Sequence, residues 1–337
     1  MARAIESYRD ALAIDPAFVD AHIELGNTFR ELKRYDDAID CFQKAIEIDP
    51  DSSRAHQNLA NMYWKLERFK EALRIFEVFD TPDSCARTLE CLFALKEYDE
   101  FYERQKAHSN DQALNLRAAA MNAFASNQLD QENPDPFCKD PSDFLRVYDA
   151  LDGIDADSQF LDELTKQLEK QAAVWEPFGK TSVSGYQTPA VLFENPTGPL
   201  ADLKRIVEDK INRYRAEEFS KDCGFTNLFP ETYAVNAWYS KLLEGGYKTP
   251  HIHPSGWLSG VFYLQCPELG DQEEGAIEFS LWGYDYSVLN ENYPRRRHYP
   301  KNGDLVLFPS SLFHGTIPFH TDEERLIIAF DLVPMER

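Results

Sequence analysis

The stretch HIHPSGWLSGVFYL, residues 251–264, decides how the second half of this 337-residue chain folds. Its β-branched and aromatic residues, bounded by Pro and Gly, are typical of a β-strand. His251 and His253 are two residues apart, so on an extended chain both imidazoles lie on one face. The strand-like runs, separated by Gly, Pro and Asn, are 233–239, 258–265 (which overlaps this stretch), 276–281, 304–308 and 325–333. Because helical patterns precede them, we predict an α+β domain whose sheet part is a sandwich or barrel.

A third histidine, His314, follows the strand-like segment 305–308 and a short turn. Two imidazoles on one strand and a third from a distant strand can converge inside the mouth of a barrel. Three nitrogen donors suit Fe, Zn, Cu or Ni rather than Mg or Ca. We therefore predict a metal site formed by His251, His253 and His314.

Arg325 lies eleven residues after His314, on what we expect to be the next strand. A guanidinium inside a barrel requires an anionic partner, because burying an isolated charge is costly. A dicarboxylate ligand supplies that partner with bidentate geometry. A salt bridge to Glu323 or Asp331 is the structural alternative. His298, which follows three arginines, is expected on a solvated loop.

Three ordered blocks resemble the 2-oxoglutarate/Fe(II) oxygenase superfamily: HIHPSGWLSGVFYL, then NGDLVLFPSSLFH, then ERLIIAFD. They are similar, more narrowly, to bacterial and phage oxygenases with an H-x-H-P…S-G-x-x-Y signature. The resemblance covers about half of the chain and includes, more weakly, the upstream stretch TSVSGYQT at 181–188. It implies a double-stranded β-helix (jelly-roll) domain with supporting helices, Fe(II), 2-oxoglutarate as cosubstrate, O2, and a hydroxylase activity.

The resemblance also implies roles for single residues. His251 and His314 match the two metal-binding histidines, and Arg325 matches the basic residue that pairs the distal carboxylate of 2-oxoglutarate; these three are the predicted catalytic residues. Tyr263 matches a tyrosine that helps to hold the same carboxylate, and Tyr239 one near the other end of the cosubstrate. Further candidates near the site are Asn236 and Ser259, and candidates to wall its cavity are Trp238, Trp257 and Phe262.

His253 departs from the pattern of the superfamily, which places a carboxylate two residues after the first histidine. A neutral imidazole there leaves more positive charge on the metal. Same-face geometry favours His253 as the third ligand, and the alternative carboxylates are Glu278 and Asp285. A cupin-like dioxygenase with three histidines and no 2-oxoglutarate is a further alternative, although such a site has no obvious need for Arg325.

The N-terminal part repeats with a period of 34 residues, counted from Val19. Small and aromatic residues recur at matched positions, which resembles the tetratricopeptide repeat. The resemblance implies pairs of antiparallel helices, and an Asp-Pro after Ile14 and Ile48 ends the second helix of a pair. The matching positions are Leu25/Leu59, Gly26/Ala60, Phe29/Tyr63, Ala38/Ala72 and Phe42/Phe76.

The chain accordingly divides into three parts. Residues 1–130 are expected to form an all-α tetratricopeptide solenoid, closed by degenerate helical repeats over 88–107 and 112–126. Residues 131–158 are expected to form a linker that ends in a packing helix around Phe144 to Tyr148. Residues 159–337 are expected to form the oxygenase-like domain. Apolar residues with helical spacing predict the first two helices of this domain, over 161–168 and 203–214.

Composition limits the possible partners and compartments. A formal net charge of -23 repels phosphates and argues against nucleic-acid binding. No apolar run approaches the ~20 residues of a membrane span, and the start MARAIESYRD lacks the apolar core of a secretory signal. Six scattered cysteines without a C-x-x-C pair fit free thiols in a reducing compartment. We therefore predict a cytoplasmic protein.

The expected function is that of a 2-oxoglutarate- and Fe(II)-dependent hydroxylase that binds a peptide or protein through the groove of its repeats. The peptide prediction rests on architectural analogy, and a small metabolite or glycan is the alternative substrate. The competing interpretation is a tetratricopeptide scaffold whose oxygenase-like domain binds metal without turnover, and His253 keeps that interpretation open.

Overall fold

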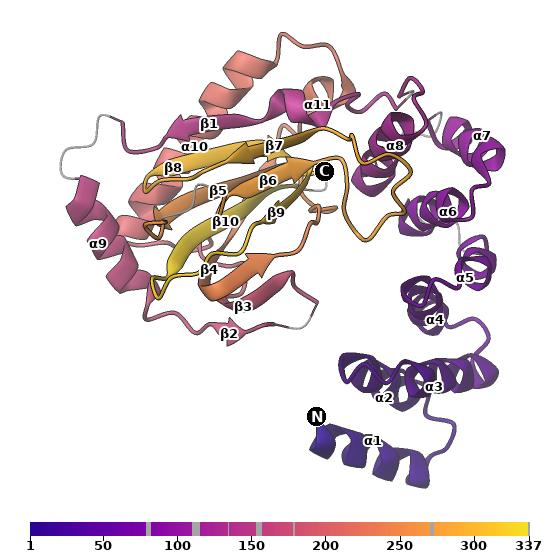
Figure 1. The fold of residues 1–337 in the computed structure, drawn as a ribbon. Coiled ribbons are helices and arrows are strands. Elements are labelled where there is room, and N and C mark those ends of the chain that lie inside the picture. Colours follow the sequence, from indigo (N-terminus) through magenta and orange to yellow (C-terminus); the bar gives the residue numbers. More distant parts are fainter. Residues whose placement is uncertain are drawn as a thin grey trace. The chain divides into compact units, whose positions relative to one another are not determined.

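The computed structural model of the chain describes residues 1–78, 82–109, 115–133, 135–152, 157–177, 179–269 and 273–335 (Figure 1). They form two compact units, Met1–Ala118 and Ala119–Arg337, and each unit is described by itself. Within the described ranges, no helix has the length and apolar character needed to cross a bilayer.

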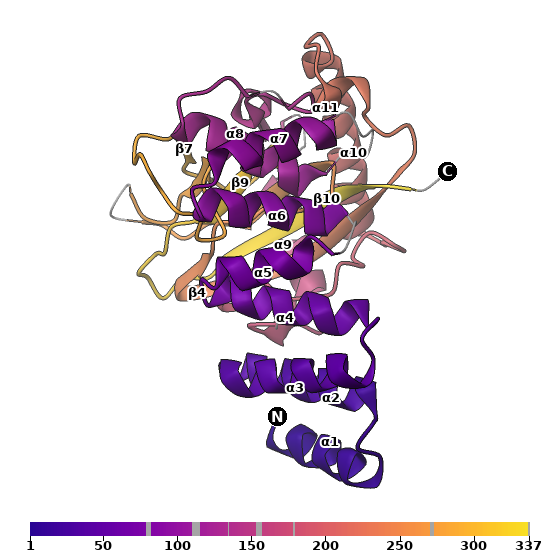
Figure 2. The ribbon, with the colours of Figure 1, turned by 90° about the vertical axis from the view of Figure 1, so that its right-hand side faces the viewer.

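The first unit is a stack of helical hairpins (Figure 2). The pairs α2/α3 and α4/α5 confirm the predicted repeat, because each pair occupies one 34-residue period. The backbone of Gly26 lies directly against Phe42, so that a Cβ at Gly26 would be 2.6 Å from the ring. The helices are α1 (Ala2–Ile14), α2 (Val19–Glu31), α3 (Tyr35–Ile48), α4 (Ser53–Lys65), α5 (Phe69–Phe76), α6 (Pro82–Ala94) and α7 (Tyr98–Ser109).

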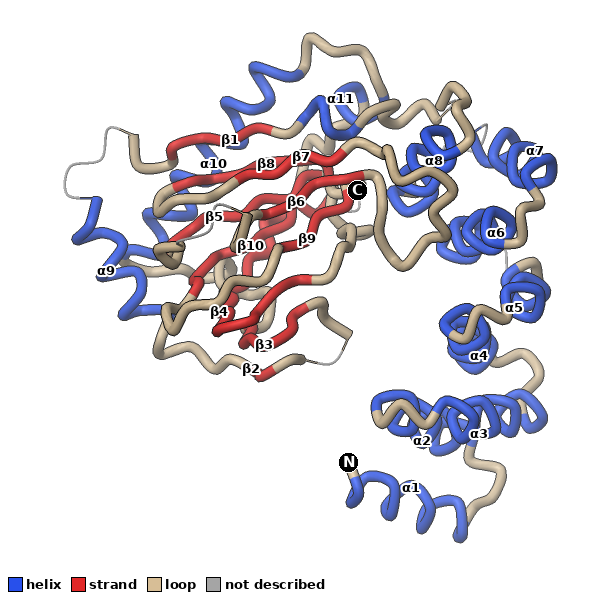
Figure 3. The backbone as a smooth tube through the Cα atoms, in the orientation of Figure 1, coloured by secondary structure: helices blue, strands red, loops and turns tan. Residues whose placement is uncertain are grey.

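The second unit is built on two antiparallel sheets, drawn as red strands in Figure 3. The larger sheet has the strand order β1-β8-β5-β10-β4-β3-β2, and the smaller has the order β7-β6-β9. The fold class is therefore α+β, as predicted. The strands are β1 (Arg146–Asp149), β2 (Val174–Trp175), β3 (Ser182–Gln187), β4 (Tyr233–Lys248), β5 (Leu258–Gln265), β6 (Ile277–Ser280), β7 (Arg295–His298), β8 (Asp304–Pro309), β9 (Phe313–Thr316) and β10 (Arg325–Pro334).

Helices support the larger sheet. The longest is α10 (Pro199–Glu218), which begins at a proline suited to the first helical turn. Its buried side chains recur every three or four residues and so form one face, and Figure 1 shows the helix behind the larger sheet. The buried apolar residues of that face are Leu203, Val207, Ile211 and Tyr214. The other helices are α8 (Leu116–Gln128), α9 (Asp157–Leu168) and α11 (Gly224–Asn227), with a 3-10 turn at Pro141–Phe144.

All five strand-like runs of the sequence are strands: β4, β5, β6, β8 and β10. The sequence did not predict β1, β2, β3, β7 or β9. The solvated loop expected at His298 is instead the end of β7, because Arg295–His298 pairs in register with Ile277–Ser280 of β6. The helix expected over 88–107 is two helices, since the chain turns at Lys96 with a positive φ of 62°.

The packing helix expected around Phe144 to Tyr148 is not formed. Phe144 ends the 3-10 turn, and Arg146–Asp149 is the edge strand β1, paired with β8. The segment before it is packed rather than open: Phe137 is buried and contacts Phe225 and Trp257. The helix expected over 112–126 is observed as α8, and positions 112–114 lie outside the described residues, as do 134 and 153–156 of the predicted linker.

The facing sides of the two sheets enclose a core and a cavity of about 470 Å³. In β5, Val261 and Tyr263 face this interior and line the cavity. Phe262, between them, is buried on the opposite face of the strand and does not line the cavity. The cavity is therefore walled by β4, β5, β8 and β10 of the larger sheet and by β6 and β9 of the smaller sheet.

Candidate metal centre

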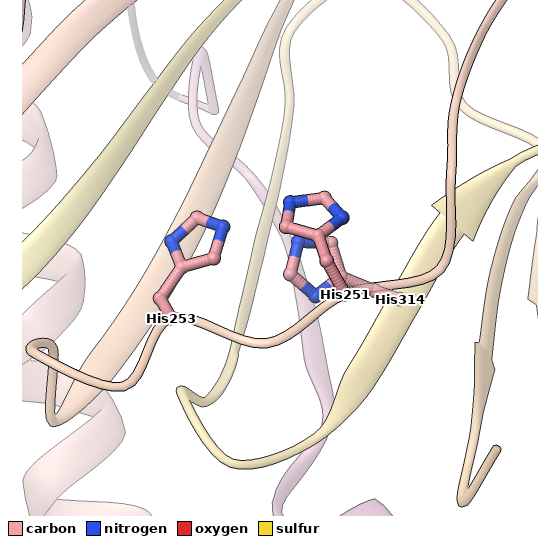
Figure 4. A group of neighbouring side chains, drawn as sticks. All are labelled: His251, His253 and His314. Atoms are coloured by element: carbon pink, nitrogen blue, oxygen red, sulfur yellow. The ribbon is translucent and has the colours of Figure 1, made fainter. Parts of the chain in front are cut away.

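Three histidines from two distant segments meet at this cavity (Figure 4). One nitrogen from each of His251, His253 and His314 lies within 4.8 Å of the other two. The ring centroids are 4.3 Å apart for His251 and His314, and 5.0 Å apart for each of the other two pairs. Among the described residues, no other group of His, Cys, Asp and Glu side chains is close enough to hold a metal ion.

Backbone pairing fixes two of these histidines. His251 and His314 form a β-bridge in which each amide donates to the carbonyl of the other at 3.0 Å. The amide of His253 donates to the carbonyl of Ser310, also at 3.0 Å. His251 lies in this isolated bridge and His253 in the loop that follows it, so the strand expected to carry both histidines is not formed; Ile252, between them, is 3% exposed and lines the same cavity.

Hydrogen bonds define the tautomer of each ring. The Nδ1 atoms of His251 and His314 lie 2.7 Å and 3.2 Å from the carbonyl oxygens of Thr249 and Leu312. The Nδ1 atom of His253 lies 2.6 Å from a carboxylate oxygen of Asp331. Each partner is an acceptor, so each Nδ1 donates its proton and leaves the Nε2 lone pair available to a metal.

Burial keeps two of these imidazoles, those of His251 and His314, neutral. Desolvation and the neighbouring histidines hold the pKa of His251 well below its usual value, and desolvation together with His253 lowers the pKa of His314 to about 3. A neutral imidazole is the form that binds a metal. His251 and His314 are therefore in the metal-binding form across the physiological pH range.

The same pKa shifts predict how the stability of the metal-free protein depends on pH. The folded pKa of His314 lies below the unfolded value of about 6.5, so the unfolded state binds more protons between about pH 6.5 and pH 3. The free energy of unfolding should fall as pH falls through this window, by at most about 1.4 kcal/mol per pH unit for this group. Urea titrations of metal-free wild type and His314→Gln should show a shallower pH dependence in the variant; equal slopes would contradict this prediction.

Asp331 is a site residue that the sequence reasoning did not assign. It was considered only as a salt-bridge partner of Arg325, whereas its carboxylate accepts from His253 at 2.6 Å and from the Ser259 hydroxyl at 2.7 Å. The six-residue spacing from Arg325 was a usable signal, since an even spacing places two strand residues on one face. A carboxylate on the far nitrogen of a ligating histidine orients the ring and makes it a stronger donor.

We expect Asp331→Asn to weaken metal binding by about 10–100-fold, because the amide cannot increase the basicity of His253 as the carboxylate does. A competition titration against a chromophoric chelator measures the change. Asp304 offers a matched control, since its carboxylate accepts from His298 at 2.8 Å but does not line the cavity. An equal loss in Asp304→Asn would show that the effect is structural rather than local to the metal centre.

Arg325 is the second feature of the cavity. Its side chain is 2% exposed, and its Nη2 donates to the carbonyl of Gly275. Its Nε and Nη1 are buried and have no hydrogen-bond partner. Within the described ranges, neither Glu323 nor Asp331 forms an ion pair with it. A buried guanidinium with two nitrogens that have no hydrogen-bond partner is suited to a carboxylate ligand.

Of the remaining candidates on the strands, some line the cavity, whereas others lie on the opposite face of their strand. Tyr263 lines the cavity, with the Arg325 guanidinium 5.6 Å from its ring, and Asn236, Trp238 and Ser259 line it too. Tyr239 does not: it follows Trp238 in β4, so its buried side chain lies on the opposite face of the sheet. The structure therefore does not bring Tyr239 to the cavity with the other candidates.

Four other candidates lie apart from the cavity. Glu278 is paired with Arg297 at 2.8 Å on the outer face of β6, and Asp285 lies in a turn with a positive φ of 57°. Neither carboxylate joins the histidine cluster. Trp257 packs against Phe225 and donates to its carbonyl, and Phe262 lies in the core on the outer face of β5.

Comparison with known proteins agrees with this geometry. Residues 236–331 match the family model described as "Putative 2OG-Fe(II) oxygenase", and residues 19–52 and 41–74 match two models described as "Tetratricopeptide repeat". No curated protein matches the chain. The chain thus joins tetratricopeptide repeats to a 2OG-Fe(II) oxygenase domain.

Similar solved structures include a prolyl-4-hydroxylase of Pseudomonas putida, with 14% identity over 57% of this chain and 93% of that chain, and a TM-score of 0.40. HygX of Streptomyces hygroscopicus, solved with nickel and 2-oxoglutarate, has 14% identity over 57% of this chain and 83% of that one, with a TM-score of 0.38. A prolyl hydroxylase of Trichoplax adhaerens, in complex with a peptide fragment, has 14% identity over 64% and 90%, with a TM-score of 0.41.

Proposed function

We propose that this protein is an Fe(II)- and 2-oxoglutarate-dependent hydroxylase in which His251, His253 and His314 hold the metal. The observation that carries the proposal is the pairing, in one cavity, of three imidazoles with a buried guanidinium that has two nitrogens without a hydrogen-bond partner. A metal chelator with a distal carboxylate satisfies both features at once. A cupin-like site without 2-oxoglutarate leaves Arg325 unexplained.

The donor set fits a first-row transition metal. The absence of a carboxylate ligand is offset in part, because Asp331 places its negative charge on the far side of the His253 ring. When bound, Fe(II) would supply the oxidative chemistry of this family, in which 2-oxoglutarate and O2 give succinate and CO2, one oxygen atom enters succinate, and the other hydroxylates a C–H bond of a second substrate. The residues of the chain bind and orient the reactants and keep the cavity largely dry.

Each cavity residue has a positioning role in this proposal. Arg325 pairs the distal carboxylate of 2-oxoglutarate, and the ring of Tyr263 limits the space beside the guanidinium. Trp238, whose ring centroid is 5.5 Å from that of His253, forms the apolar wall next to the metal. Asn236 and Ser259 add polar groups to the same wall, and Ser259 is already engaged by Asp331.

Succinate release tests the proposal. Protein loaded with Fe(II) without oxygen should form succinate when 2-oxoglutarate and O2 are added, even without the second substrate. Omission of Fe(II), or its replacement by Zn(II), should abolish the product. Tight metal binding without any succinate would favour the competing function, a tetratricopeptide scaffold with a metal-binding domain that does not turn over.

The tetratricopeptide repeats indicate a role in protein interaction, and we infer that the second substrate is presented by a protein or peptide partner. Support comes from the confirmed repeat architecture, which commonly serves this purpose. A pull-down with the full chain as bait tests the inference. Mass spectrometry of the captured protein should then show a mass gain of one oxygen atom. A small metabolite that stimulates succinate release in the absence of any protein partner would contradict it.

A further inference from the structure

Lys248 is a second buried cation of the cavity, and the proposed chemistry does not use it. The residue ends β4, lines the cavity and is 8% exposed. The strand then leads directly through Thr249 and Pro250 to His251. His251 and His314 line the same cavity as Lys248.

The partners of Lys248 are neutral. Its Nζ donates to the hydroxyl of Ser182 and, at 3.1 Å, to the side-chain carbonyl of Gln187. An ammonium has three N–H groups, so one remains for a ligand. In the ranges that the structure describes, no carboxylate lies within ion-pair distance of Lys248. Burial, followed by the charge of Lys180, lowers the pKa of Lys248 to about 7, as expected for an amine that lacks a counter-ion.

Lys248 and Arg325 approach the cavity from different strands. Arg325 begins β10 beside Tyr263, whereas Lys248 ends β4 beside β3 and β9, in register with Ser182. The side of the cavity at Lys248 also holds the Thr181 hydroxyl, 3.5 Å from Nε2 of His251. A single 2-oxoglutarate that is paired with Arg325 and chelates the metal does not require a second buried cation.

We propose that Lys248 binds a carboxylate of the second substrate and so selects an anionic substrate for hydroxylation next to the metal. This inference rests on the proposed function. The carboxylate can belong to a small organic acid or to an acidic side chain of a peptide, since either group supplies the same anionic oxygens. Gln187 holds the ammonium in place, and Thr181 offers a hydroxyl to the same group.

Ligand-observed NMR on the full chain tests the proposal. The protein is loaded with Zn(II), which permits no turnover, and titrated first with 2-oxoglutarate. Failure of that titration is a failure of the proposed function. With 2-oxoglutarate saturating, propionate should then bind at least tenfold more tightly than propionamide, which has the same shape without the charge. Replacing Zn(II) with paramagnetic Mn(II) should broaden the propionate signals if the probe lies beside the metal.

Matched variants assign the effect to Lys248. Lys248→Met should weaken propionate binding at least tenfold and leave 2-oxoglutarate binding within about twofold. Lys241→Met is the control, because it removes the same charge at an ion pair with Glu324 outside the cavity and should leave propionate binding within about twofold. A blocked glutamate, acetyl-Glu-methylamide, should bind more tightly than propionate if the carboxylate comes from a peptide, and more weakly if it comes from a small acid.

Three outcomes would overturn the inference: equal binding of propionate and propionamide, equal propionate affinity in wild type and Lys248→Met, or a loss of 2-oxoglutarate binding in Lys248→Met as large as the loss of propionate binding. The last result would assign Lys248 to the cosubstrate instead. Should Lys248→Met fail to fold, the comparison of propionate with propionamide on the wild type decides the question alone.

Discussion

Replacement of Arg325 by methionine should weaken 2-oxoglutarate binding by about 30-fold to several thousand-fold. Removing one partner of a buried, hydrogen-bonded charge pair costs about 2–5 kcal/mol, and each ~1.4 kcal/mol is a factor of ten. The expected loss is this large because the guanidinium is 2% exposed and water cannot replace it. Calorimetric titration of the Zn(II)-loaded protein measures the affinity without consuming the cosubstrate.

Two further variants show whether the loss is specific. Arg325→Lys should recover part of the affinity, because a lysine keeps the charge but lacks the planar fork that binds a carboxylate through two N–H groups. Arg297→Gln removes the same charge at an exposed ion pair with Glu278 and should change the affinity by no more than about twofold. Unchanged binding in Arg325→Met would place the cosubstrate elsewhere.

Loss of His314 should abolish stable metal binding. His314 is one of only three donors in the cluster, and the described residues offer no substitute ligand within reach. In His314→Ala we expect the metal affinity to fall by more than the ~10–100-fold typical of groups that merely orient a ligand, and succinate release to cease. Absorption of the Co(II)-loaded protein reports the ligand field directly.

The control for this variant is His320→Ala. His320 is exposed and pairs with Glu274 outside the cavity, so its removal should leave Co(II) absorption and succinate release unchanged. Circular dichroism verifies that His314→Ala remains folded, because the residue is buried and its removal leaves a small void. Full metal occupancy in folded His314→Ala would refute the three-histidine centre.

Central strands could be predicted from the sequence because their own residues carry the signal. Nearly all residues of β5 and β10 are buried, so each strand appears as a continuous apolar run. The short strands β7 and β9 could not be predicted in this way. Arg295–His298 is a run of cations that becomes a strand only by pairing with β6, where Arg297 lies opposite Glu278. Pairing with a strand that is distant in the sequence cannot be detected from the residues of a short segment alone.

One rule guided the prediction of the candidate site: successive side chains of a β-strand point to opposite faces. The rings of His251 and His253 do come together, with centroids 5.0 Å apart, but the residues lie in an isolated bridge and the loop after it rather than in a strand. The same rule could have excluded Tyr239, since Asn236 and Tyr239 are three residues apart and cannot share a face of β4. The rule could not predict the face on which Lys248 lies, because the register between β3 and β4 shifts before β4 ends.

The reciprocal amide bonds between His251 and His314 have a consequence for how the protein acquires its metal. These bonds join the two ligand-bearing segments before any ion arrives, so loading need not order a loop or close a lid. The centre should behave as a rigid chelator: ion uptake should proceed at a rate set by water exchange at the metal, with little change in heat capacity.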